Sequence, residues 1–325
     1  TVDAGNVLGK LGIYAVSTFF IISGMSMYLA YKNFMWDSHG VFNFIAKRYL
    51  RLFPAFFVSC SAVVIFHWAI GDSYSVSLNT FLLNITFLFA FLQPAGYMPT
   101  GGWSIGCEVV FYTLFPLIIF FKKKGIIVAL ILSFITFIYY SFVEMMPATS
   151  LGDHWKAYIQ PFNQIFYFVS GIAIAAFSFG HKLYNRLTWL ILLAAVLAFS
   201  LYPSEGNLIS IVTGYDRLAL TFICIILCIS FFHLDINLGF NKALKFFGDI
   251  SYGIYIFHGI ISEVFLFTLS KLGINDSTDR LLLLTFINLP IIIAFSYIFY
   301  RYIEMKFMHV SKVISMAPPD STVLK

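Results

Sequence analysis

Residues 11–31 read LGIYAVSTFFIISGMSMYLAY, a run of 21 residues without a charged side chain. An α-helix rises about 1.5 Å per residue, so about 20 apolar residues cross the roughly 30 Å hydrocarbon core of a bilayer. The run predicts a transmembrane helix.

The composition extends this prediction to the whole chain. Of its 325 residues, 60% are hydrophobic, 19% are aromatic and 11% are charged, with a mean hydropathy of +0.88. Soluble domains carry about 25% charge. These figures exclude a soluble domain, a disordered chain, a coiled coil and a secreted disulfide scaffold. We therefore expect an all-α, polytopic transmembrane helical bundle.

Nine apolar runs have about the length of a membrane span. They are residues 11–31, 53–70, 104–121, 126–143, 158–180, 187–202, 218–232, 250–270 and 281–300. A tenth stretch, residues 78–92, is short and interrupted by Asn79 and Asn84. We expect it to lie re-entrant or interfacial.

The basic residues support that choice. If residues 78–92 do not cross, 15 of the 20 Lys and Arg residues share one side of the membrane, against Lys10, Lys156, Arg217, Lys271 and Arg280 on the other. The side richer in Lys and Arg is the cytoplasmic one. The net charge of +5 is thus explained by topology and lipid headgroups, and no nucleic-acid partner is expected.

Nine spans with a cytoplasmic C-terminus place residue 1 outside, so we expect a further span upstream of Thr1. We interpret residues 1–306 as one integral membrane domain and residues 307–325 as a cytoplasmic tail. Cys60, Cys107, Cys224 and Cys228 show no CxxC spacing, and neither a metal site nor a bound cofactor is expected.

Polar residues at membrane depth are costly and need a partner or a role. Glu108 lies five residues into its run and His258 eight residues into its own, with Glu263 farther along. We interpret His67, beside Trp68, as a packing residue. For Glu108 and His258 a functional role is favoured over hydrogen-bonded packing.

The residues at the N-termini of these two helices predict different roles. Gly101-Gly102-Trp103-Ser104 precedes Glu108, and a glycine-rich helix N-terminus presents N–H groups that suit an anion or a developing oxyanion. Asp249, in GDISYG at 248–253, is interpreted as the N-cap of the His258 helix.

Two basic clusters stand at predicted cytoplasmic ends. Arg48 and Arg51, in KRYLRLFP at 47–54, are three residues apart and share a helix face. They suit either anionic lipid or a phosphorylated ligand, which forked guanidinium groups hold better than lysines do. The lysines at 122–124 are interpreted as a topological stop signal.

Four stretches together resemble the membrane acyltransferase family 3, whose members O-acylate bacterial surface glycans. They are VSTFFIISG at 16–24, RYLRLFP at 48–54, WSIGCE at 103–108 with Phe111-Tyr112 and Phe115-Pro116, and ISYGIYIFH at 250–258. Each is weak alone, but the four occur in the family's order. The family's core has ten spans.

The resemblance implies an enzyme that moves an acyl group, usually acetyl, from cytoplasmic acyl-CoA to a hydroxyl of a surface glycan or lipid-linked sugar. It implies that Arg48 and Arg51 bind the donor and that Glu108 and His258 are catalytic. The residues it implies as substrate contacts are Trp103, Ser104, Tyr112 and Tyr252. The family's principal histidine is expected upstream of Thr1. Serine at 17 departs from the acidic residue often found there.

Two other functions fit the same polar residues. A non-enzymatic transporter of glycans or lipid-linked sugars would also line a cavity with Glu, His and Arg. It would not need arginines gathered at one mouth. A polysaccharide polymerase predicts large outer loops rich in Arg and His, which this sequence lacks. The acceptor glycan and the acyl chain are left open by the sequence.

Overall fold

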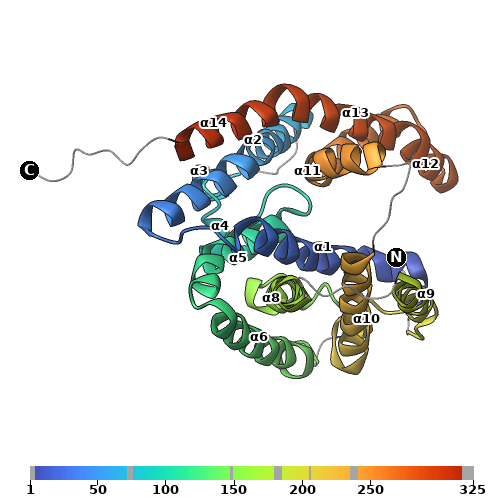
Figure 1. The fold of residues 1–325 in the computed structure, drawn as a ribbon. Coiled ribbons are helices and arrows are strands. Elements are labelled where there is room, and N and C mark those ends of the chain that lie inside the picture. Colours follow the sequence, from blue (N-terminus) through green and yellow to red (C-terminus); the bar gives the residue numbers. More distant parts are fainter. Residues whose placement is uncertain are drawn as a thin grey trace, which may run out of the picture. The chain divides into compact units, whose positions relative to one another are not determined.

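The structure is a computed structural model that describes residues 4–71, 76–146, 149–178, 185–204, 206–234 and 241–316. For residues 311–316 it describes the backbone alone. Every regular element in these ranges is a helix (Figure 1). The prediction of an all-α bundle is confirmed.

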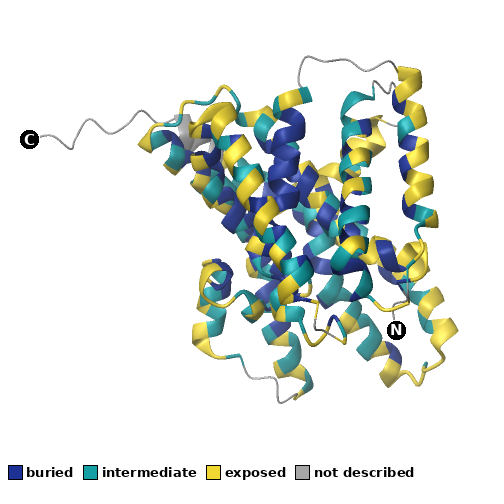
Figure 2. Ribbon diagram, turned by 90° about the horizontal axis from the view of Figure 1, so that it is seen from below, coloured by how far each residue is buried: buried dark blue, intermediate teal, exposed yellow. Residues whose placement is uncertain are grey.

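Eight helices of the described chain are long and apolar enough to cross a membrane. They are Val7–Tyr31, Ser38–Ile70, Gly102–Phe120, Lys122–Glu144, Trp155–Ser178, Gly214–His233, Asn241–Lys271 and Ser277–Val310. Asn185–Leu201, the predicted sixth run, is apolar but shorter. Large apolar side chains are exposed along many of these helices, as a lipid-facing surface requires (Figure 2).

The chain forms two compact units. Unit 1 comprises Thr1–Met35 and Cys107–Ile236, and unit 2 comprises Trp36–Gly106 and Asn237–Lys325. The helix α5 (Gly102–Phe120) passes from one to the other.

Unit 1 is built on the packing of α1 (Val7–Tyr31) against α8 (Pro161–Ser178), its most extensive helix pair. A Cβ on Gly24 would collide with the Phe168 carbonyl oxygen, and a Cβ on Gly171 with the Ile21 carbonyl oxygen. Each glycine therefore admits the backbone of the other helix. Small residues serve this purpose in membranes, where helix association depends on close packing.

The other helices of unit 1 surround this pair. They are α6 (Lys122–Tyr139), which continues as η2 (Tyr140–Glu144), then α7 (Trp155–Tyr158), α9 (Asn185–Leu201), η3 (Ser210–Val212) and α10 (Gly214–His233). The helix α6 packs on α8, and α10 packs on both α9 and α1.

Unit 2 is built on α2 (Ser38–Ile70) and α11 (Asn241–Lys271), which pack together. The last helical stretch consists of α12 (Ser277–Leu283), η4 (Leu284–Asn288), α13 (Leu289–Phe299), η5 (Tyr300–Glu304) and α14 (Met305–Met316). The helix α13 packs on α11, and α14 packs on α2. The first residues of the predicted tail thus continue a helix, and residues 317–325 lie outside the described chain.

The stretch at 78–92 does not form one helix. It divides into α3 (Leu78–Ile85) and α4 (Phe89–Leu92), followed by η1 (Pro94–Gly96), and Phe87 between them has a φ of 59°. Buried Asn84 donates to the carbonyls of Thr80 and Gly96, and its Oδ1 accepts from the Met98 N–H. The Asn84 amide thus pairs backbone groups that a continuous helix would pair by its own backbone hydrogen bonds.

The prediction for Asp249 is wrong. The helix α11 begins at Asn241, eight residues earlier, so Asp249 lies inside the helix and caps nothing. Residues 241–249, which read NKALKFFGD, mix charged, polar and apolar side chains and extend the helix beyond the apolar run.

We expect Gly24→Ala to lower the stability of the full-length protein by about 1–3 kcal/mol, because the new methyl group meets backbone atoms of α8 that cannot rotate away. Gly12→Ala on the same helix is the matched control, since nothing lies within 4 Å of its Cβ position. Thermal unfolding in detergent measures both. Equal midpoints for the two variants would contradict the close-packing role.

We also expect Asn84→Leu to cost about 1–3 kcal/mol, because it leaves the Gly96 carbonyl and the Met98 N–H unpaired. Asn79→Leu, one turn earlier at an exposed position of α3, should have little effect. Limited proteolysis and thermal unfolding report the difference. A loss as large in Asn79→Leu would show that the helix, and not the amide, is being tested.

Candidate functional site

In unit 1 the carboxylate of Glu108 is held by two hydroxyl groups. Its side chain is 2% exposed. Its Oε1 accepts from Ser23 Oγ on α1 at 3.0 Å and from the Tyr112 hydroxyl, one turn along α5, at 2.8 Å. The two hydroxyl oxygens are 3.4 Å apart. Two motifs separated by about 80 residues of sequence thus meet at one carboxylate.

Aromatic rings of α5 pack with rings of α1 and α8. Phe111 stacks on Phe168 at 5.2 Å between centroids and meets Phe20 edge-on at the same distance. Tyr112 lies edge-on to Phe168 at 6.3 Å. A carboxylate in such surroundings loses its water, and hydroxyl donors compensate for part of that loss. The arrangement holds an acceptor group in a fixed place on the helix α5.

In unit 2 the imidazole of His258 has a defined orientation. Its Nδ1 lies against the Tyr255 carbonyl oxygen of the preceding turn. A carbonyl can only accept, so Nδ1 carries the proton and Nε2 is the nitrogen with the lone pair. The side chain is half-buried. Such an imidazole can accept a proton at Nε2.

The glycine-rich entry to α5 packs directly on the His258 helix. Gly101 has a φ of 80°, and a Cβ there would lie 2.9 Å from the Tyr255 hydroxyl oxygen, so both its conformation and its surroundings require glycine. The Tyr255 hydroxyl donates to the Gly101 carbonyl at 3.1 Å and accepts from Ser104 Oγ at 2.7 Å. Farther along α11, Gly259 leaves room for the Thr100 side chain.

A second tyrosine joins the arginine motif to the same helix. The Tyr252 hydroxyl donates to the Leu52 carbonyl of α2 at 2.6 Å. Ser59 of α2 donates to the Ile256 carbonyl of α11 at 3.1 Å. The carbonyl of Leu52 lies two residues before Pro54, inside the helix. Three of the four quoted motifs are therefore in hydrogen-bond contact within unit 2.

The predicted donor-binding arginines both lie on α2. The Arg48 guanidinium is 5.8 Å from the centroid of the Phe44 ring. Arg51 is exposed. Its positive charge interacts electrostatically with the buried side chain of Glu304 in η5. Of the predicted substrate contacts, Trp103, Ser104 and Tyr112 are buried, while Tyr252 is half-buried.

The remaining polar residues serve packing. His67 Nε2 lies 3.3 Å from Glu263 Oε1 and ties α2 to α11. The four cysteines are free and buried. No group of three potential ligands for a metal ion occurs among the described residues.

Two buried cations were missed by the sequence analysis, which counted them with the outer basic residues. Lys10 is 1% exposed, and its Nζ donates to the carbonyls of Ser200 and Tyr202 at the end of α9. Arg217 is also 1% exposed; it donates to the Asn163 carbonyl at 3.1 Å and lies 4.3 Å from the Phe137 ring centroid. Each stands directly before a predicted apolar run, at 11–31 and 218–232, where nothing in the sequence indicates a buried side chain.

The structure thus groups the predicted residues by unit. Ser23, Glu108 and Tyr112 lie together in unit 1. Unit 2 holds Ser104, Tyr252 and His258 around Tyr255 and the glycine-rich turn, and the arginines on α2. Tyr255, which hydrogen bonds to two motif positions, was not among the predicted site residues.

Comparisons with known proteins agree with the motifs. A protein of Acidianus two-tailed virus named as an acetyltransferase, ORF330, is 26% identical over 229 residues, which are 68% of this chain and 66% of that protein. The acyltransferase MdmB of Streptomyces mycarofaciens is 29% identical over 184 residues, 51% of this chain and 46% of that protein.

The chain therefore spans less than two thirds of the length of either relative. No solved structure matches it significantly. The family model described as an acyltransferase domain, of the acyltransferase 3 type, matches residues 3–301. That match covers nearly the whole chain, which accordingly belongs to the acyltransferase 3 family.

Proposed function

We propose that this protein is a membrane O-acyltransferase that moves an acetyl group from acetyl-CoA on the cytoplasmic side to a hydroxyl of a cell-surface glycan or lipid-linked sugar. The observation that carries the proposal is the carboxylate of Glu108, held by Ser23 and Tyr112 from two separate motifs. Family membership and the acetyltransferase name of one relative support the choice of reaction.

The reaction sets definite requirements. The acceptor oxygen attacks the thioester carbonyl, a C–O bond forms, the C–S bond breaks, and the hydroxyl proton ends on the CoA sulfur. A base must take that proton, donors must stabilise the tetrahedral oxyanion, and cations must hold the CoA phosphates. Each requirement has a candidate in the chain.

His258 would serve as a proton acceptor through Nε2, since Nδ1 is committed to the Tyr255 carbonyl. Glu108, which accepts from Ser23 and Tyr112, would use its carboxylate to position a substrate hydroxyl. Ser104 and Trp103, at the start of α5, would contact the substrate.

Arg48 and Arg51 would hold the phosphates of CoA. They are one helical turn apart on α2, and each guanidinium can offer two parallel N–H groups to a phosphate. Arg51 is exposed and Arg48 half-buried, as a site for a soluble donor requires. A sugar transporter or a polymerase would have no use for acetyl-CoA. Transfer of labelled acetyl from acetyl-CoA by the full-length protein in membranes separates these functions from the proposed one.

We expect Glu108→Gln to reduce acetyl transfer by about 100-fold or more while the fold is kept. The amide oxygen can still accept from Ser23 and Tyr112, so the change removes the charge and spares the packing. Glu144→Gln, at an exposed glutamate, is the matched control. Normal transfer by Glu108→Gln at normal protein level would defeat the assignment.

We expect the double variant Arg48→Lys, Arg51→Lys to raise the KM for acetyl-CoA by about tenfold or more, because lysine keeps the charge and loses the bidentate contact. Lys47→Ala, which removes a charge from the same cluster, should change KM less. Initial rates over a range of acetyl-CoA concentrations give the comparison. If Lys47→Ala has the larger effect, the cluster acts through overall charge and these arginines do not grip the donor.

A further inference from the structure

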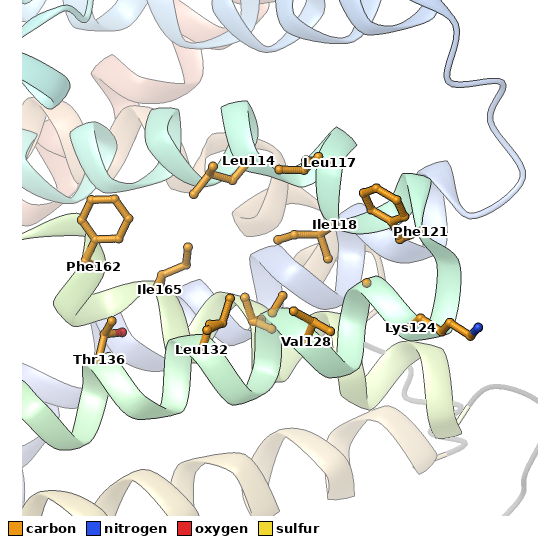
Figure 3. Close-up of a pocket in the computed structure, with 13 residues that line it drawn as sticks. Leu114, Leu117, Ile118, Phe121, Lys124, Val128, Leu132, Thr136, Phe162 and Ile165 are labelled. Atoms are coloured by element: carbon orange, nitrogen blue, oxygen red, sulfur yellow. The ribbon is translucent and has the colours of Figure 1, made fainter.

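An apolar groove runs along the outside of unit 1, separate from the polar residues described above. Its volume is about 500 Å³, within the range of about 300–1,000 Å³ for ligand sites. The helices α5, α6 and α8 line it (Figure 3). The lining is apolar apart from Lys124 and Thr136.

The lining suits a hydrocarbon chain. Leu117, Val128 and Leu132 are each more than half exposed, so the groove is open at the surface of the bundle. Lys124 is its one charged lining residue and stands at one end, while Thr136 lies toward the other (Figure 3). The twelve residue steps from Lys124 to Thr136 along α6 span about 18 Å, close to the roughly 15 Å depth of one bilayer leaflet.

The charged end of the groove is made by a tight corner. A single residue, Phe121, separates α5 from α6, and Lys122 has a φ of 52°. Gly125 lets the first turn of α6 approach the Ile118 carbonyl, where a Cβ would collide. This corner places three consecutive lysines, Lys122 to Lys124, at the beginning of the helix that lines the groove.

The corner attracts an anion. All three lysines are exposed, and none forms an ion pair within the described part of the chain. No side chain caps the N-terminus of α6, whose first N–H groups carry the positive end of the helix dipole. Cations beside an apolar groove of one leaflet's depth complement a molecule with a phosphate head and a hydrocarbon chain.

We propose that this groove is a binding site for an anionic phospholipid, with one acyl chain along α6 and the phosphate at Lys122 to Lys124. The lysine corner then has a ligand as well as a topological role. The site lies outside the proposed reaction centre, and its occupancy does not depend on acyl transfer.

The test is native mass spectrometry of the full-length protein with phosphatidylglycerol and phosphatidylcholine of identical chains in competition. The wild-type protein should prefer phosphatidylglycerol, and Lys124→Ala should reduce that preference about fivefold, the effect of one lysine near an anionic headgroup. Lys156→Ala, at an exposed lysine outside the groove, is the matched control.

A second pair of variants tests the chain position. Leu132→Trp fills the groove and should lower retention of both lipids, whereas Leu193→Trp, on α9, should not; the two leucines are 58% and 57% exposed. Inorganic phosphate at millimolar concentration should leave retention unchanged. Equal binding of the two lipids by the wild-type protein, an effect of Lys156→Ala as large as that of Lys124→Ala, or matching losses in the two tryptophan variants would overturn the proposal.

Discussion

The backbone contact between α1 and α8 is the constraint on which unit 1 depends. Gly24 and Gly171 each accept the backbone of the opposite helix, so the two helices approach more closely than any other residue type would allow. Ser23 precedes Gly24 and turns its hydroxyl to Glu108. Gly24 thus joins α1 to α8, and the neighbouring Ser23 joins α1 to α5. Two consecutive residues of α1 therefore serve two different helix contacts.

A lipid environment explains most of the other polar contacts. With no water in the hydrocarbon region, each polar group needs a partner from the protein. Asn84 replaces the ladder of a broken helix, and Lys10 binds the last carbonyls of α9, where the helix dipole favours a cation. Arg217 combines a carbonyl with the face of the Phe137 ring. These contacts stabilise the fold.

The sequence predicts the helices well because apolar runs are local signals. It fails where a contact is made over a long separation. Lys10 and Arg217 were counted as outer charges, but both side chains are buried and contact distant parts of the chain. Asp249 was wrongly predicted as an N-cap because the helix begins before the apolar run, at Asn241. Tyr255 was overlooked because nothing in its neighbourhood shows that Gly101 and Ser104 will meet it.

Glu108 and His258 differ in what they can do. Glu108 is an acceptor already engaged by two hydroxyl hydrogens, so its strongest capacity is to orient a donor or to balance a positive charge. In His258, Nδ1 is hydrogen bonded to the Tyr255 carbonyl oxygen, and Nε2 is the nitrogen that can accept a proton. Acyl transfer from a thioester to a hydroxyl moves a proton from that hydroxyl to the leaving sulfur, and a protein group must carry it between the two. On this chemistry the imidazole is suited to the proton and the carboxylate to the positioning of its partners.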